Sequence, residues 1–181
     1  MTDSELAKRV VQGDPEATAK FVDLHYGSVY RYARVLSGHD QDAEDLAVRT
    51  ILKAKNGLAG FRGSSGLRSW VHSIAYREVL AWRKRQEPVM RLSGTETIPD
   101  HPFRAVDDAE ALRLALAQIP EGQRQAFVMF EILEMELKEV ARALRVPQGT
   151  VKSRLFHAKR ALREQLTPKQ DQVGGRRVYE S

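Results

Sequence analysis

Apolar residues recur at helical spacing along most of the chain. In the first half they predict three long helices: from Pro15 to the "SGHD" stretch, from Asp40 to Asn56, and from Leu67 to about Arg85. The letters "GDPEA" give the first of these helices an N-cap aspartate, a first-position proline and a first-turn glutamate. Together the three segments predict one helical bundle.

The helical spacing fails between residues 87 and 106, where "EPVMRLSGTETIPDHPFRAV" contains three prolines. It returns in "DDAEALRLALAQI", "EGQRQAFVMFEILE" and "LKEVARALR", and again in residues 146–166, which predicts four short helices. Strict alternation of apolar and polar residues, the pattern of a strand, is absent. We therefore predict an all-α fold of two small helical domains, residues 1–86 and 107–166, joined by a flexible linker and followed by a disordered tail at 167–181.

The composition narrows the classes of function that the chain can have. Its 181 residues carry a net charge of +5 and a pI of about 9.6, which favours an acidic partner such as nucleic acid. The absence of cysteine excludes disulfides, thiolate metal sites and thiol catalysis. No apolar run approaches the roughly 20 residues of a membrane span, and the first residues show no signal-peptide pattern. We expect a cytoplasmic protein without membrane insertion.

The last predicted helix is strongly basic on one side. A rotation of about 100° per residue gathers an apolar stripe of Val151, Leu155, Ala158 and Leu162. The opposite side carries Lys152, Ser153, Phe156, Arg160 and Arg163. No acid lies between Arg142 and Arg163, whereas a solvated helix normally mixes charges. Cations near a helix C-terminus can simply compensate the helix dipole, but Phe156 among them fits contact with a thymine methyl group in DNA.

The preceding letters "LKEVARALRVP" supply a short helix and a tight turn, so the pair predicts a helix-turn-helix whose second helix enters the major groove. From "LAQIPEGQRQAF" to "KRALREQL" the sequence resembles region 4 of the sigma-70 family, in its small extracytoplasmic-function (ECF) type. The segments "LAKRVVQGDPEA", "DAEDLAVRTILKA", "FRGSSGLRSWVHSIA" and "WRKRQ" resemble region 2 of that family, so the resemblance covers about residues 5–166.

The resemblance implies a sigma factor that binds core RNA polymerase and promoter DNA. Region 4 would read the duplex minus-thirty-five element and region 2 would capture the unpaired strand of the minus-ten element. Such factors commonly have an anti-sigma partner. We expect the free protein to be a monomer, because neither half shows an obvious dimerisation seam.

Three sets of residues are expected to make these contacts. The minus-thirty-five set on the last helix is Lys152, Ser153, Arg154, Phe156, His157, Lys159, Arg160 and Arg163. The minus-ten set is Tyr76, Arg77, Trp82, Arg83, Lys84, Arg85 and Arg91, whose rings could stack on unpaired bases. The core polymerase set is Asp42, Asp45, Leu46 and Arg49. A simpler alternative for the minus-ten set is that Trp82 belongs to the core and the cations keep the bundle soluble.

The chain departs from the family pattern at several of these positions. Val48 and Arg49 replace a polar and an acidic residue on the polymerase-facing helix, which would change affinity or geometry there. Arg77 stands where the family usually has a base-reading asparagine and Ala81 where an aspartate is common, so the minus-ten preference does not carry over. His157 replaces a frequent arginine, and a neutral imidazole makes weaker contacts with phosphate or guanine.

Two other classes of protein fit parts of the sequence. A helix-turn-helix regulator acting without core polymerase would need a receiver, ligand or dimerisation domain, and residues 1–86 instead predict a helical bundle with a basic, aromatic face. The carboxylates of "HDQDAED" could bind a divalent metal, but they lack the glycine of a calcium loop. We therefore predict no catalytic residue, no metal and no cofactor.

Overall fold

The computed structural model describes residues 1–63, 66–92 and 108–166, with the backbone alone for 87–92 and 108–110. All regular structure in these residues is helical, which confirms the predicted all-α class. The first bundle contains α1 (Asp3–Val11), α2 (Pro15–Ser37), α3 (Asp40–Gly57), the 3-10 turn η1 (Leu58–Gly60) and α4 (Leu67–Leu92). The second contains α5 (Asp108–Gln118), α6 (Glu121–Phe127), the π-helical turn η2 (Val128–Ile132), α7 (Leu137–Leu144) and α8 (Gln148–Leu166).

Helix α2 begins and ends where the sequence pattern predicts. The Asp14 side chain accepts a hydrogen bond from the Ala17 amide at 3.1 Å, and Pro15 takes the first helical position. Gly38 ends the helix in the left-handed conformation, with φ of 80°, which glycine adopts without steric cost. The next helix, α3, follows directly and packs along α2.

Helix α1 is not predicted by the apolar spacing, yet it fixes the start of α4. Thr2 and Glu5 form a capping box at its first turn, which is the one sequence signal that could have revealed it. Asp3 accepts a hydrogen bond from the Leu67 amide at 2.6 Å, so the first turn of α1 caps α4. The two helices are thereby tied across 64 positions of sequence.

Helix α4 is longer than the apolar spacing predicts. It continues past Pro88 to Leu92, so the expectation that the chain becomes irregular at residue 87 is wrong for residues 87–92. A proline removes one backbone hydrogen bond and does not alone decide where a helix ends. The rest of the expected linker, from residue 93, and the expected tail at 167–181 lie outside the described residues.

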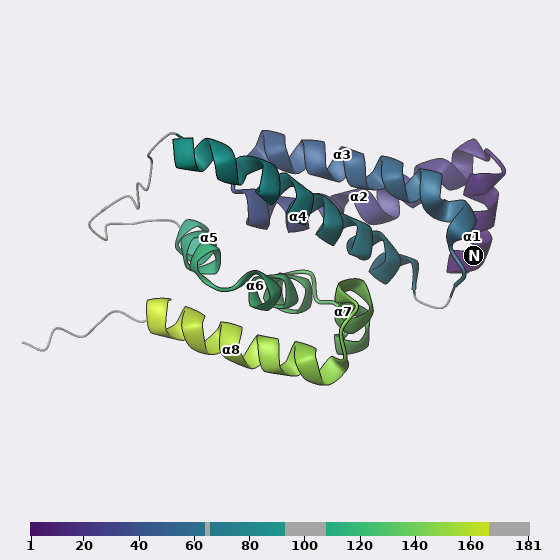
Figure 1. Cartoon of the computed structure of the whole chain (residues 1–181). Helices are drawn as coiled ribbons and strands as arrows, with labels where there is room; N and C mark the ends of the chain where they lie inside the picture. The colour runs from purple at the N-terminus through teal and green to yellow at the C-terminus, as the bar shows by residue number, and fades with distance from the viewer. Residues whose placement is uncertain (64–65, 93–107, 167–181) are drawn as a thin grey trace, which may run out of the picture.

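The two bundles pack against each other. Buried residues of the first include Phe21, Tyr32, Leu46 and Val71, and those of the second include Leu116, Met129, Val140 and Val151. All of these belong to one apolar cluster. In Figure 1 the second bundle lies beneath α4, with α7 beside it and α8 on the side away from the first bundle. The position of α8 leaves its outer face uncovered by the rest of the described chain.

Candidate nucleic-acid interface

Helices α7 and α8 form the predicted helix-turn-helix. A capping box between Glu136 and Glu139 starts α7, and Arg145 ends it in the left-handed conformation with φ of 56°. The Val146 amide closes the turn by donating to the Ala141 carbonyl oxygen at 3.0 Å. The second helix of the motif then packs across the first.

The rotation predicted for α8 is confirmed. Its buried residues are Val151, Leu155, Ala158 and Leu162, the four of the predicted apolar stripe. Phe156 lies on the opposite side and exposes 63 % of its surface. Its ring meets the His157 ring edge to face, with centroids 5.4 Å apart. An aromatic side chain this exposed adds little to the core.

Seven of the eight residues expected at the minus-thirty-five element are exposed on α8. Arg154 is the exception, because it is half-buried and its guanidinium lies over α6. A side-chain carbon at Gly122 would come within 2.9 Å of the Arg154 Cζ atom, so glycine there makes this close approach possible. Lys159 is partly neutralised by Glu131, whose Oε1 lies 2.6 Å from its Nζ.

The residues expected to bind an unpaired strand divide into two groups on α4. Arg77, Lys84 and Arg85 are exposed, whereas Tyr76, Trp82 and Arg83 are half-buried. Arg91 lies in the last turns of the helix, where the described structure is limited to backbone.

Trp82 packs partly against the core, as the simpler alternative expects, but its indole Nε1 is buried without a hydrogen-bond partner among the described residues. Buried indole N–H groups usually have a partner. Arg83 is occupied: its Nη1 lies 2.5 Å from Glu121 of α6, and its Nη2 donates to the Leu36 carbonyl oxygen at 3.1 Å.

The acidic start of α3 is only partly available to a partner. Asp45 and Arg49 are exposed and Asp42 is half-buried, but Leu46 exposes 1 % of its surface and belongs to the core. The same helix exposes two apolar side chains, Val48 at 47 % and Leu52 at 53 %, of which the sequence had indicated only Val48 at this surface. Their spacing of four residues, on a helix whose other apolar residues face inward, is the sequence signal for them.

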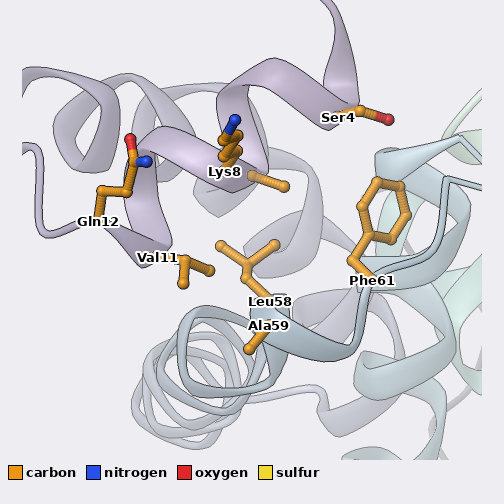
Figure 2. A pocket seen from close by; sticks show the side chains of 8 residues that line it. Ser4, Lys8, Val11, Gln12, Leu58, Ala59 and Phe61 are labelled. Carbon is orange, nitrogen blue, oxygen red and sulfur yellow. The ribbon is translucent and has the colours of Figure 1, made fainter.

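A shallow hollow of about 320 Å³ lies between α1 and η1. Figure 2 shows Lys8 and Val11 of α1 on one side and Leu58 and Phe61 on the other. The hollow has no counterpart in the sequence analysis. Among the described residues no group of three or more acids and histidines could hold a metal ion, and none of the described helices is long and apolar enough to cross a membrane.

Comparison with known proteins gives matches in both bundles. Residues 21–88 match the family model for sigma-70 region 2, and residues 109–162 match the model for sigma-70 region 4. A relative from Mycobacterium tuberculosis, described as "ECF RNA polymerase sigma factor SigM", is 31% identical over 163 residues, which cover 89% of this chain and 83% of that protein. The "ECF RNA polymerase sigma factor SigW" of Bacillus subtilis is 25% identical over 175 residues, or 88% of this chain and 94% of the relative.

A solved structure has the same architecture. It contains the sigma factor RpoE in complex with the anti-sigma factor NepR from Bartonella quintana. The similarity has a TM-score of 0.67 and 26% sequence identity, and it covers 84% of this chain and 98% of that one. The two matched regions therefore lie within a fold that this chain shares with a solved sigma factor.

Proposed function

Since this chain belongs to the sigma-70 family of RNA polymerase sigma factors, in its ECF group, we propose that it binds core RNA polymerase and directs initiation at specific promoters. The observation that carries the proposal is the exposed, acid-poor face of α8 with Phe156 at its centre. The alternative regulator that works without polymerase is not favoured, because the region 2 match occupies the place of a ligand or dimerisation domain.

We infer that different parts of α8 contact the bases and the phosphates of the duplex. The side chains nearest the start of the exposed face would meet base edges: Lys152, Ser153, Phe156 and His157. The later cations would mainly meet phosphates: Lys159, Arg160 and Arg163. The Arg154 guanidinium lies over α6, so this residue would support DNA binding by holding α8 in position and by its own positive charge.

The unpaired minus-ten strand would contact α4. Exposed Arg77, Lys84 and Arg85 supply positive charge beside the rings of Tyr76 and Trp82, and base-on-ring stacking tolerates many sequences. Arg83 would join this surface after it leaves Glu121, and Arg91 extends it along the sequence.

Core polymerase would contact α3. Asp42, Asp45 and Arg49 supply charge, and the exposed Val48 and Leu52 supply the apolar area that a stable protein interface needs. Leu46 would act from beneath by holding the helix in place, because its side chain is enclosed.

We propose that these activities divide between residues 1–92, since α4 continues to Leu92, and residues 107–166, with 93–106 as the connection and 167–181 as a tail. Limited proteolysis tests this division, since cleavage should produce two stable fragments and should not begin inside residues 107–166. The factor would act in the cytoplasm, as a transcription initiation factor and not as an enzyme. An anti-sigma factor is a fitting further partner, because the solved relative is bound to one.

In vitro transcription with core polymerase on a genomic library tests the function and reports both promoter elements. Transcript starts should appear only when the protein is added. Run-off products that never depend on the protein contradict the proposal. Gel shifts with and without core polymerase separate the alternative, because a regulator of the helix-turn-helix class would bind its site tightly without polymerase.

A further inference from the structure

Two arginines from different bundles face each other at the boundary between α4 and α7. Arg77 belongs to α4, and Arg145 ends α7 at the turn into α8. The two helices pack along each other (Figure 1). The guanidinium groups are near enough for the positive charge of Arg145 to act on Arg77. The folded chain therefore brings two like charges together where its bundles meet.

The backbone of Arg145 has a conformation that is unfavourable for an arginine. Its φ of 56° and ψ of 45° lie in the left-handed region, where a Cβ atom meets a steric penalty that glycine avoids. Glu134 is the one other non-glycine residue with a positive φ in the described part of the chain. Such residues cluster at binding sites, where the surrounding structure holds them in place. Arg145 is therefore a candidate for a binding residue.

Neither guanidinium has an acidic partner. Within the described residues the side chains of Arg77 and Arg145 make no hydrogen bond and no ion pair. Glu78 is the acid whose charge acts on Arg77, but its Oε1 lies 2.6 Å from the Nζ of Lys53 on α3, which already neutralises it. Both arginines are exposed, so an anion from solvent can reach them.

The surroundings of Arg77 favour the addition of an anion. Partial burial lowers the pKa of Arg77 and the charge of Arg145 lowers it further, whereas Glu78 raises it. A lowered pKa means that the charged guanidinium is less well stabilised here than in water. An anion between the two arginines would offset their repulsion and accept hydrogen bonds from both. The pair is an open, positively charged site without a counter-charge of its own.

A phosphate group matches this pair in geometry and in charge. Each guanidinium presents a planar set of N–H donors that suits the oxygen atoms of a phosphate. A terminal phosphate carries a charge of about −1.5 to −2 at pH 7, which balances two arginines, whereas a carboxylate balances one. We propose that Arg77 and Arg145 form a binding site for a phosphate dianion that the two bundles share.

The shared site has two consequences. It is complete only while α4 and α7 are packed together, so a bound phosphate should stabilise the packed arrangement. It requires no contact with a promoter, so its occupation is independent of the proposed function. Inorganic phosphate and the terminal phosphate of a nucleotide are two sources of the same group, and the experiment has an arm for each.

Isothermal titration calorimetry on the full chain measures the binding of inorganic phosphate and, separately, of adenosine monophosphate at constant ionic strength. We expect dissociation constants on the order of 1 mM, as two charge-assisted contacts at an exposed site allow. Equal affinity for both ligands supports a site for the phosphate group alone, and tighter binding of the nucleotide supports a nucleotide as the source. Adenosine lacks a phosphate and should not bind, so adenosine binding as tight as that of the nucleotide overturns the proposal.

Three variants locate the site on both bundles. Arg77→Gln removes one charge from the first bundle, and Arg145→Gly removes the other from the second while giving the left-handed position the residue that fits it. Each should weaken phosphate binding about ten-fold. Arg142→Gln is the matched control, because it removes the same charge from an exposed position on α7 and should bind phosphate like the wild-type chain. Far-UV circular dichroism establishes that each variant is folded.

Energy transfer between two dyes reports the packing of the bundles. The chain has no cysteine, so Gln41→Cys on α3 and Gln165→Cys on α8 carry the dyes without background. Transfer should rise as phosphate saturates the site. The proposal is overturned if phosphate binding is not saturable, if Arg142→Gln weakens it as much as the two site variants do, or if phosphate binds without raising transfer. Should Arg77→Gln fail to fold, Arg145→Gly alone decides.

Discussion

Two buried histidines should make the first bundle sensitive to mild acid. His25 and His72 expose 6 % and 0 % of their surface. His25 packs against Phe21, with ring centroids 5.0 Å apart, and neither of its ring nitrogens has a partner among the described residues. The Nδ1 atom of His72 lies 2.9 Å from the Arg68 carbonyl oxygen, while its Nε2 is also without a partner. At either site a charged imidazolium would be buried with at least one unpaired N–H group, which lowers the free energy of unfolding.

Burial lowers the pKa of both histidines from 6.5 to about 4. The unfolded chain therefore takes up a proton at each ring near pH 6.5, while the folded chain stays neutral until about pH 4. The stability that this difference supports is complete above pH 6.5 and is lost as the pH falls through 6.5 toward 4. At pH 5 the free energy of unfolding is lower by about 2 kcal/mol for each histidine, or about 4 kcal/mol for the pair.

Urea unfolding followed by far-UV circular dichroism at pH 7, 6 and 5 measures this loss. The carboxylates of Asp14, Asp40 and Glu136, whose pKa values are lowered by hydrogen bonds, titrate below this range and add little to it. Replacing both buried histidines by leucine should remove most of the pH dependence, whereas His39→Gln, at an exposed position, should leave it unchanged. A loss below about 1 kcal/mol between pH 7 and 5, or one that survives both leucine substitutions, refutes the reasoning.

Five substitutions test the interfaces and one helix cap. Phe156→Ala should flatten the preference among minus-thirty-five variants, worth roughly 1 to 3 kcal/mol for a good contact, and Arg163→Ala should instead weaken all variants and lower the salt dependence. Holoenzyme binding at two salt concentrations separates them, and an unchanged ranking for Phe156→Ala would show that the exposed ring makes no contact with a base. Arg145→Glu should raise energy transfer between a dye at Gln41→Cys on α3 and a dye at Gln165→Cys on α8. The positive charge of Arg145 is, after burial, the next cause that lowers the pKa of Arg77 on α4, so a negative charge there replaces repulsion between the bundles by attraction. A fall in transfer would contradict this. Leu52→Glu should weaken core polymerase binding in a pull-down with an unchanged unfolding curve, and equal binding would remove Leu52 from that interface. Asp3→Ala should lower the free energy of unfolding by about 1 kcal/mol in urea titration through the lost cap on α4, and no change would show that the cap is dispensable.

Local signals in the sequence are enough for the helices that begin and end with clear caps. Asp14 and Gly38 define α2, and the rotation of α8 follows from its apolar spacing, because one face must be buried. Leu46 could have been recognised as core from the same spacing, since Ala43 and Ala54 lie on its side of α3. The family resemblance assigned it to the polymerase surface instead.

The contact between the bundles has no such signal. Tyr32 and Gln125 are 93 positions apart, and nothing in the spacing of either helix indicates that a tyrosine hydroxyl and a glutamine amide will meet. Short helices are difficult for a related reason: α1 has nine residues, and its start depends on a capping box more than on an apolar stripe. The end of α4 is set beyond a proline, where the sequence alone favours a break.

The pairing of Arg83 with Glu121 also bears on the thermodynamics of strand capture. In the packed molecule the acidic side chain holds the position on Arg83 that a DNA phosphate would take. When a strand displaces Glu121, one anion replaces another on the same guanidinium, and part of the charge neutralisation has already been made inside the protein. Added salt weakens the contact of Arg83 with a phosphate, but it also weakens the Arg83–Glu121 pair that must separate first, so the two effects oppose each other. Net counterion release on capture is therefore smaller than the number of phosphate contacts on α4 implies, and the affinity of the full chain for unpaired DNA depends less steeply on salt.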